Sequence, residues 1–128
     1  MDIVSAVFCE NINLRQVPGP STRIDLSGIM FSLPAPSEPP VTITPHLIVL
    51  VRCRPDEAGN GILEVLFKDE AGEEVARNAS PFTVEPGKFT YRLVRAELTY
   101  PAPGTVEAHC RVDRGPWTVV PLTLLPPA

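Results

Sequence analysis

The chain has few histidine and cysteine side chains that could hold a zinc ion, and they are far apart in the sequence. Two histidines and three cysteines are the strongest candidates: His46, His109, Cys9, Cys53 and Cys110. No two of them have the close spacing of a zinc motif such as C-x₂-C or H-x₃-H. His109 and Cys110 are adjacent, so in a strand they point to opposite faces and cannot share one ion. The sequence therefore predicts no metal site and no cofactor.

Nucleophilic catalysis also lacks its usual sequence setting. No serine lies in a G-x-S-x-G motif, and the two histidines are widely separated. A glycine-rich phosphate-binding loop is likewise absent from the sequence. We therefore predict that the protein is not an enzyme. The alternative is a small enzyme whose site is assembled from scattered residues, such as His109 with Glu107 or Glu64.

Acidic side chains gather in the predicted turns, and some β-sandwiches bind calcium through such loops. Asp56 and Glu57 are expected at one end of the fold together with Asp113, whereas the acidic residues of 69–74 fall at the other end. Calcium takes about six to eight oxygen ligands, and a divided set supplies them poorly. Whether Asp56, Glu57 and Asp113 bind an ion stays open, and calcium-dependent docking is a further alternative.

The composition indicates one globular domain over residues 1–128. Sixteen prolines are hard to place in long helices but easy to place in loops and at strand ends. The net charge of −4 disfavours non-specific binding to nucleic acid or to an anionic membrane. No stretch is apolar for long enough to span a bilayer. We therefore expect neither nucleic acid nor membrane among the partners.

The cysteines and the first residues bear on the compartment. The segment Met1–Val4 lacks the basic start and apolar core of a secretory signal. Three widely spaced cysteines fit buried free thiols better than a disulfide framework. The alternative is a bridge between Cys53 and Cys110, but Trp117 follows the second cysteine instead of lying between the two. We expect a cytoplasmic protein with three free thiols.

Short strands separated by turn residues make up the predicted secondary structure. Loops are expected over Asn11–Thr22 and over the crossover Pro34–Pro40, where proline disfavours helix. A change of parity between Leu93 and Val94 predicts a bulge or a change of sheet. The expected strands are Asp2–Glu10, Arg23–Leu33, His46–Arg54, Ile62–Lys68, a short one near Val75, Phe89–Tyr100, Thr105–Asp113 and Trp117–Leu125. The pattern predicts an all-β, two-sheet antiparallel β-sandwich, immunoglobulin-like, with about seven to eight strands.

The segment Thr105–Asp113 alternates most clearly. One parity carries small apolar residues that should be buried: Val106, Ala108, Cys110 and Val112. The other parity places Glu107, His109 and Arg111 on the outward face, where Glu64 and Lys68 are the expected cross-strand partners. This face is predicted to be a solvated sheet surface, with recognition as the alternative.

The last predicted strand, Trp117–Leu125, combines a proline with many apolar residues. Pro121 removes a backbone donor, which suggests an edge strand. Leu122 and Leu124 are among side chains too apolar for an uncovered edge, so something should cover them. The crossover Pro34–Pro40, a second copy of the chain or another protein could do so, and we favour the last two.

The turn motifs resemble those of a known group of proteins. Cys9-Glu10, Ile24–Gly28, Asp56–Gly59, Asp69–Gly72 and Pro103-Gly104 are followed by a closing strand over Val119–Leu125. This order is similar to that of small bacterial β-sandwich domains of unknown function, of the type common in actinobacteria. The resemblance covers nearly the whole chain. It implies a sandwich fold and a bacterial cytosolic setting, and it brings no catalytic residues.

These observations predict a non-catalytic binding or structural module that docks onto a protein partner or self-associates. The candidate binding residues lie on the charged sheet face and on the last strand: Glu64, Lys68, Glu107, His109, Arg111, Leu122 and Leu124.

Overall fold

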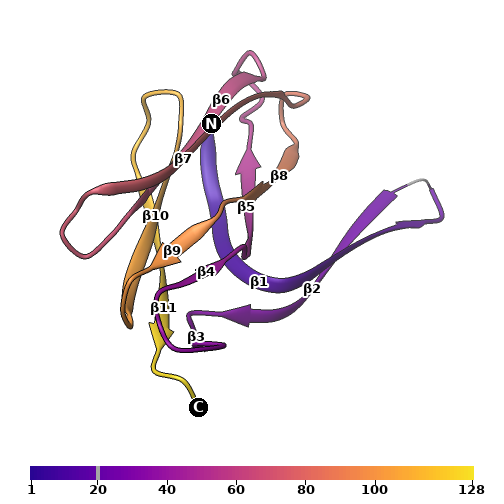
Figure 1. Cartoon of the computed structure of the whole chain (residues 1–128). Coiled ribbons are helices and arrows are strands. Elements are labelled where there is room, and N and C mark those ends of the chain that lie inside the picture. Colours follow the sequence, from indigo (N-terminus) through magenta and orange to yellow (C-terminus); the bar gives the residue numbers. More distant parts are fainter. Residues whose placement is uncertain (20) are drawn as a thin grey trace.

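The computed structural model describes residues 1–19 and 21–128, and these residues form strands, turns and bends without a helix (Figure 1). The all-β prediction is confirmed. The described strands are β1 (Asp2–Val17), β2 (Ser21–Met30), β3 (Ser32–Pro34), β4 (Val41–Ile43), β5 (His46–Arg52), β6 (Asn60–Lys68), β7 (Glu74–Thr83), β8 (Phe89–Arg95), β9 (Leu98–Tyr100), β10 (Gly104–Val112) and β11 (Thr118–Leu125). They outnumber the predicted strands mainly because β3, β4 and β9 are three-residue segments that alternation cannot reveal.

The strands form a four-stranded sheet in the order β2-β1-β5-β8 and a five-stranded sheet in the order β3-β11-β10-β6-β7. A two-stranded sheet joins β4 to β9. The pairing is antiparallel except between β3 and β11, which are parallel, so the expectation of purely antiparallel sheets is wrong at that edge. The consecutive strands β5 and β6 lie in different sheets. The turn between them carries the chain from one sheet to the other.

The core lies between the two large sheets. One cluster of buried side chains combines Leu47, Val49 and Val51 of β5 with residues of β6, β10 and β11. In β10 the buried parity is the predicted one: Val106, Ala108, Cys110 and Val112. The register inferred from the alternation of this strand is therefore confirmed, because a one-residue slip would have exposed all four.

The chain leaves the four-stranded sheet after Arg95, two residues beyond the parity change at Leu93. β8 pairs with β5 from Phe89 to Arg95 in an unbroken register, and β9 then pairs with β4. Val94 and Leu98 are buried in the core, whereas Phe89 and Leu93 point the other way and are exposed. The chain does change sheet, but it does so after Arg95 and not between Leu93 and Val94, where the sequence placed the change. The parity of Phe89 and Leu93 faces outward.

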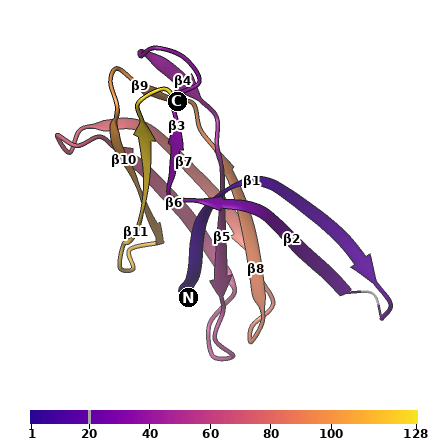
Figure 2. The same ribbon diagram turned by 90° about the horizontal axis from the view of Figure 1, so that it is seen from below.

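The expected loop over Asn11–Thr22 is wrong. β1 continues to Val17 and pairs with β2 as far as Val17↔Ser21, so the segment is a long hairpin. Gly28 has a φ of +68°, and a side chain there would overlap Glu10, which explains the glycine at the base of this ribbon. The two views show the end of the ribbon projecting from the body (Figures 1 and 2). We call residues 11–17 and 21–27 the arm.

The last strand is covered from within the chain more than the sequence suggested. Its inward parity, Val120, Leu122 and Leu124, is buried in the core, so Leu122 and Leu124 are not surface residues. These side chains are buried because the opposite sheet covers them. β3 also pairs with Thr123–Leu125, and the amide of Ala35 donates to the carbonyl of Leu125. The crossover, which we had not favoured, thus protects the end of this edge.

The three cysteines are buried free thiols, as expected: Cys9, Cys53 and Cys110. Burial raises the pKa of the Cys110 thiol to about 12 and also raises the pKa of Cys9. In the described residues, no helix is long and apolar enough to cross a membrane.

Candidate functional site

The charged residues predicted from β10 gather on the outer face of the five-stranded sheet. Register pairs Glu107 with Lys68 and Arg111 with Glu64, which are the cross-strand partners that the sequence indicated. Arg111 Nε lies 2.7 Å from Glu64 Oε1, and both side chains are only partly exposed. A half-buried pair of this kind stabilises a sheet face modestly and gives it a defined charge pattern.

An indole that the sequence analysis did not include completes this cluster. The guanidinium carbon of Arg111 lies 4.2 Å from the centroid of the Trp117 ring, a cation–π distance. His109 meets the same ring edge to face, with centroids 6.3 Å apart. Trp117 stands just before β11, so only the hairpin between β10 and β11 brings it over Arg111. Stacking of this kind holds the guanidinium in one orientation.

His109 is the one member of the cluster with a chemically unusual environment. Its Nε2 atom is buried and has no hydrogen-bond partner among the described residues. Glu107 Oε1 lies 3.4 Å away without completing a hydrogen bond. The two side chains lie on one strand face, where the Trp117 ring packs against His109 and Glu107 is about half exposed. Five pockets of the described residues are lined by other side chains.

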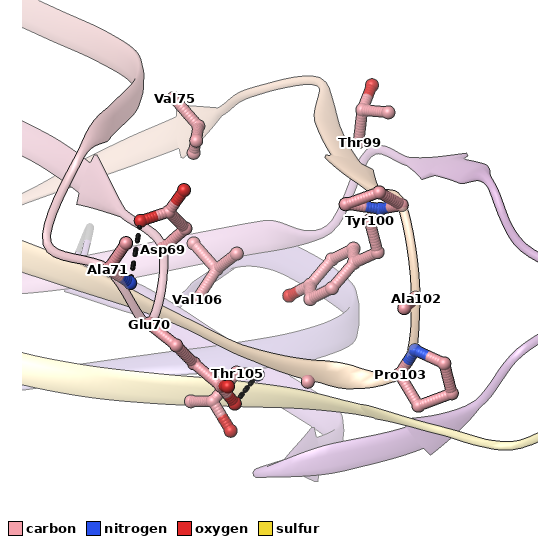
Figure 3. Close-up of a pocket in the computed structure, with 12 residues that line it drawn as sticks. Asp69, Glu70, Ala71, Val75, Thr99, Tyr100, Ala102, Pro103, Thr105 and Val106 are labelled. Atoms are coloured by element: carbon pink, nitrogen blue, oxygen red, sulfur yellow. Dashed lines mark hydrogen bonds between the residues drawn. The ribbon is translucent and has the colours of Figure 1, made fainter.

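A small pocket of about 250 Å³ lies where the β6–β7 turn meets the segment before β10 (Figure 3). Its polar groups already have partners within the fold. Asp69 Oδ1 accepts hydrogen bonds from the amides of Ala71 and Glu73, and Glu70 Oε1 accepts one from the amide of Thr105. The hydroxyl of Tyr100 donates to the carbonyl of Leu122 over 2.9 Å, and burial raises the pKa of this phenol. The carboxylates here hold turns in place.

The acidic turns at the other end are engaged in the same way. Glu57 accepts hydrogen bonds from the amide of Arg54 and from the N-terminal amine, and these bonds lower its pKa. Asp113 Oδ1 accepts from the amide of Ile62 at 3.0 Å. Within residues 1–19 and 21–128, no three histidine, cysteine or acidic side chains are grouped as a metal site would require. The calcium alternative thus gains no support from Asp56, Glu57 and Asp113.

A different surface, on the outer face of the four-stranded sheet, is strongly apolar. Since Leu47, Val49 and Val51 of β5 face the core, Ile48 and Leu50 point away from it. Register extends each position into a row across three strands: Val7–Ile48–Leu93 and Ser5–Leu50–Tyr91. Phe89 flanks the second row and is 62% exposed, and Leu93 is 46% exposed, whereas Ile48 at the centre is 2% exposed. We call these two rows with Phe89 the outer apolar face.

Two signals in the sequence could have revealed the outer apolar face. The run Leu47–Val51 does not alternate, and an uninterrupted apolar strand is typical of a sheet covered on both faces. In β8 the outward parity carries Phe89, Tyr91 and Leu93, and apolar Val94 follows on the other parity; we interpreted this change as a bulge or a change of sheet. Sheet order was the missing information, because it is the pairing of β1, β5 and β8 that puts these residues side by side.

No known protein-family pattern matches the chain, and no curated protein matches it in sequence. The resemblance to actinobacterial sandwich domains therefore stays a prediction.

Proposed function

We propose that this protein is a non-catalytic binding module, an immunoglobulin-like two-sheet sandwich that acts in the cytoplasm by docking onto an apolar protein surface. The observation that carries the proposal is the outer apolar face. Exposed Leu93 pairs with Ile48, and partly exposed Tyr91 pairs with Leu50. Exposed Phe89 lies on the same face of β8, so the apolar area is contiguous, not scattered. Contiguous apolar patches on soluble domains are characteristic of protein–protein contacts.

The surroundings of this face indicate what kind of partner fits it. The two central rows carry no charged side chain, while Arg52 and Arg95 stand at the two ends of the β5–β8 pairing. A partner with an apolar, uncharged contact surface would therefore bury no unpaired charge at the centre. Nucleic acid, whose backbone is charged, does not match this chemistry.

Site-specific photo-crosslinking tests the proposal. A photoreactive amino acid replaces Leu93 in cells that naturally produce the chain, and the control carries it at Ile62. Ile62 is an equally exposed aliphatic residue on the outer face of the other sheet. We expect a discrete crosslinked protein from position 93 that is lost with Leu50→Lys. Equal, diffuse labelling from both positions would refute docking through this face.

An acid–base site at His109 and Glu107 is the second candidate function. The unpartnered Nε2 atom of His109 is the observation in its favour. A reaction would need a concave site around this atom, and the open sheet face offers substrate little enclosure.

A further inference from the structure

The arm is amphipathic across its two strands. Cross-strand pairs Ile12↔Leu26 and Leu14↔Ile24 place four aliphatic side chains on one face. The opposite face carries Asn13↔Asp25 and Arg15↔Arg23, and Arg15 forms an ion pair with Asp25 at 2.6 Å. In the body of a sheet such alternation separates a buried face from a solvated one. The aliphatic side of the arm is therefore built to be covered.

The described part of this chain covers this aliphatic side only in part, since Ile12, Ile24 and Leu26 stay partly exposed. The core cluster includes none of the four aliphatic side chains, and Leu14 is 43% exposed. Isolated two-stranded hairpins are only marginally stable in water, so an arm this long gains from a surface to lie on. On β1, Ile12 and Leu14 have the parity of core-facing Phe8, whereas Val7 of the outer apolar face has the opposite parity.

We propose that the arm of one copy packs its aliphatic face onto the outer apolar face of a second copy of this chain. This inference rests on the proposed function and names the partner. Each copy carries one amphipathic ribbon and one sheet face with exposed apolar side chains at Leu93 and Phe89, so two identical chains satisfy both surfaces at once. In both views β5 and β8 lie between the β10–β11 pair and the arm, which leaves the outer side of the four-stranded sheet next to the arm (Figures 1 and 2).

The length and the charge distribution of the arm fit the outer apolar face of a second copy. The β1 strand of the arm, residues 11–17, is as long as β5, which runs from His46 to Arg52. The contacting faces are free of charged groups on both sides, because the charges of Arg15, Arg23 and Asp25 lie on the other face of the arm. A reciprocal exchange would engage both the arm and the outer apolar face of each copy, so one dimer would contain two such contacts.

The test is the oligomeric state of the purified chain and of matched variants, measured by sedimentation equilibrium. We expect the native protein to form dimers or larger assemblies. Leu14→Lys on the arm and Leu93→Lys on the sheet should each weaken association at least tenfold. The controls are Asn13→Lys, on the polar face of the arm, and Ile62→Lys, on the other sheet. Both controls should associate like the native chain, and circular dichroism in urea checks that each variant folds.

Mixing the two defective variants separates this contact from any other. The Leu14→Lys protein keeps an intact sheet and the Leu93→Lys protein keeps an intact arm, so together they can form one arm–sheet contact. We expect mixed dimers to appear although neither variant associates alone. If Leu93→Lys fails to fold, Phe89→Lys replaces it at a more exposed position of the same face.

Three results would overturn the inference: a monomeric native chain, association that survives Leu93→Lys, or no mixed dimer. Crosslinking in cells then shows whether the proposed function falls with it. A crosslink from position 93 to a different protein would preserve docking and exclude the second copy as partner. Loss of both the self-association and the specific crosslink would remove both proposals.

Discussion

Replacing Leu122 by alanine should destabilise the fold far more than the same kind of truncation three residues earlier. Leu122 is 0% exposed and lies in the core, whereas Val119, on the opposite parity of β11, is 44% exposed. The difference between the two variants in free energy of unfolding thus tests which side chains of β11 point into the core. It bears directly on whether the apolar side chains of β11 form core or surface.

The magnitude follows from burial. Leu→Ala removes three carbon atoms from an apolar environment, which costs about 2.4 kcal/mol at roughly 0.8 kcal/mol for each buried methylene. The cavity left behind adds about 1 kcal/mol, giving about 3–3.5 kcal/mol. Val119→Ala removes two half-exposed methyl groups and should cost less than about 1 kcal/mol. The backbone carbonyl of Leu122 keeps its hydrogen bond from Tyr100 in the variant, so no polar group loses its partner.

Equilibrium unfolding in urea, followed by far-ultraviolet circular dichroism at one protein concentration, measures both differences. A slope of about 1.5 kcal/mol/M converts the expected loss for Leu122→Ala into a midpoint lower by about 2 M. Val119→Ala should move the midpoint by less than about 0.7 M on the same slope. Equal midpoint shifts with unchanged slopes would mean that β11 does not face the core as described, and the register of the five-stranded sheet would be wrong.

Two further outcomes test the charged cluster and the cysteines. A double-mutant cycle of Glu64→Ala and Arg111→Ala should give a coupling free energy of about 0.5–1 kcal/mol. This coupling should be smaller in the Trp117→Leu background, where the ring that packs on the guanidinium is gone. A coupling indistinguishable from zero would contradict the observed geometry. Thiol titration should count three reactive groups after denaturation without reductant, and almost none at Cys110 in the native protein. With a pKa of about 12, about one Cys110 thiol in ten thousand is ionised at pH 8; a denatured count of one would instead reveal a disulfide.

Local alternation predicted the parts of the fold whose two faces meet different environments. In β10 small apolar residues alternate with Glu107, His109 and Arg111, so the buried parity and the partners Glu64 and Lys68 could be inferred from the sequence. The pairing of strands that are far apart in the sequence could not be predicted in this way. Whether β5 pairs with β6 or with β1 depends on which turn crosses between sheets, and Pro55–Gly61 is compatible with both. The docking residues Leu122 and Leu124 were misplaced for the same reason, because their cover comes from the opposite sheet.

The arm shows how one strong local signal can hide another. Pro18 and Gly19 favour a turn, and the sequence analysis extended that turn into a loop back to Asn11. Yet Asn11 to Arg15 alternates polar and aliphatic side chains with the period of a strand, and Ile24 and Leu26 repeat the pattern across the turn. A turn at the tip of two alternating segments is the signature of a hairpin.

The two large sheets differ in a way that bears on what the structure leaves uncovered. β10 alternates between apolar and charged residues, so the charged outer face of this strand can contact water. β5 does not alternate, and the rows through Ile48 and Leu50 are apolar on the face away from the core. Leu93 and Phe89 expose apolar side chains beside these rows, and such a surface next to an amphipathic arm indicates a contact that covers it. An arm and an apolar sheet on the same chain require only a second copy for that contact, and the mixing of Leu14→Lys with Leu93→Lys decides whether they meet.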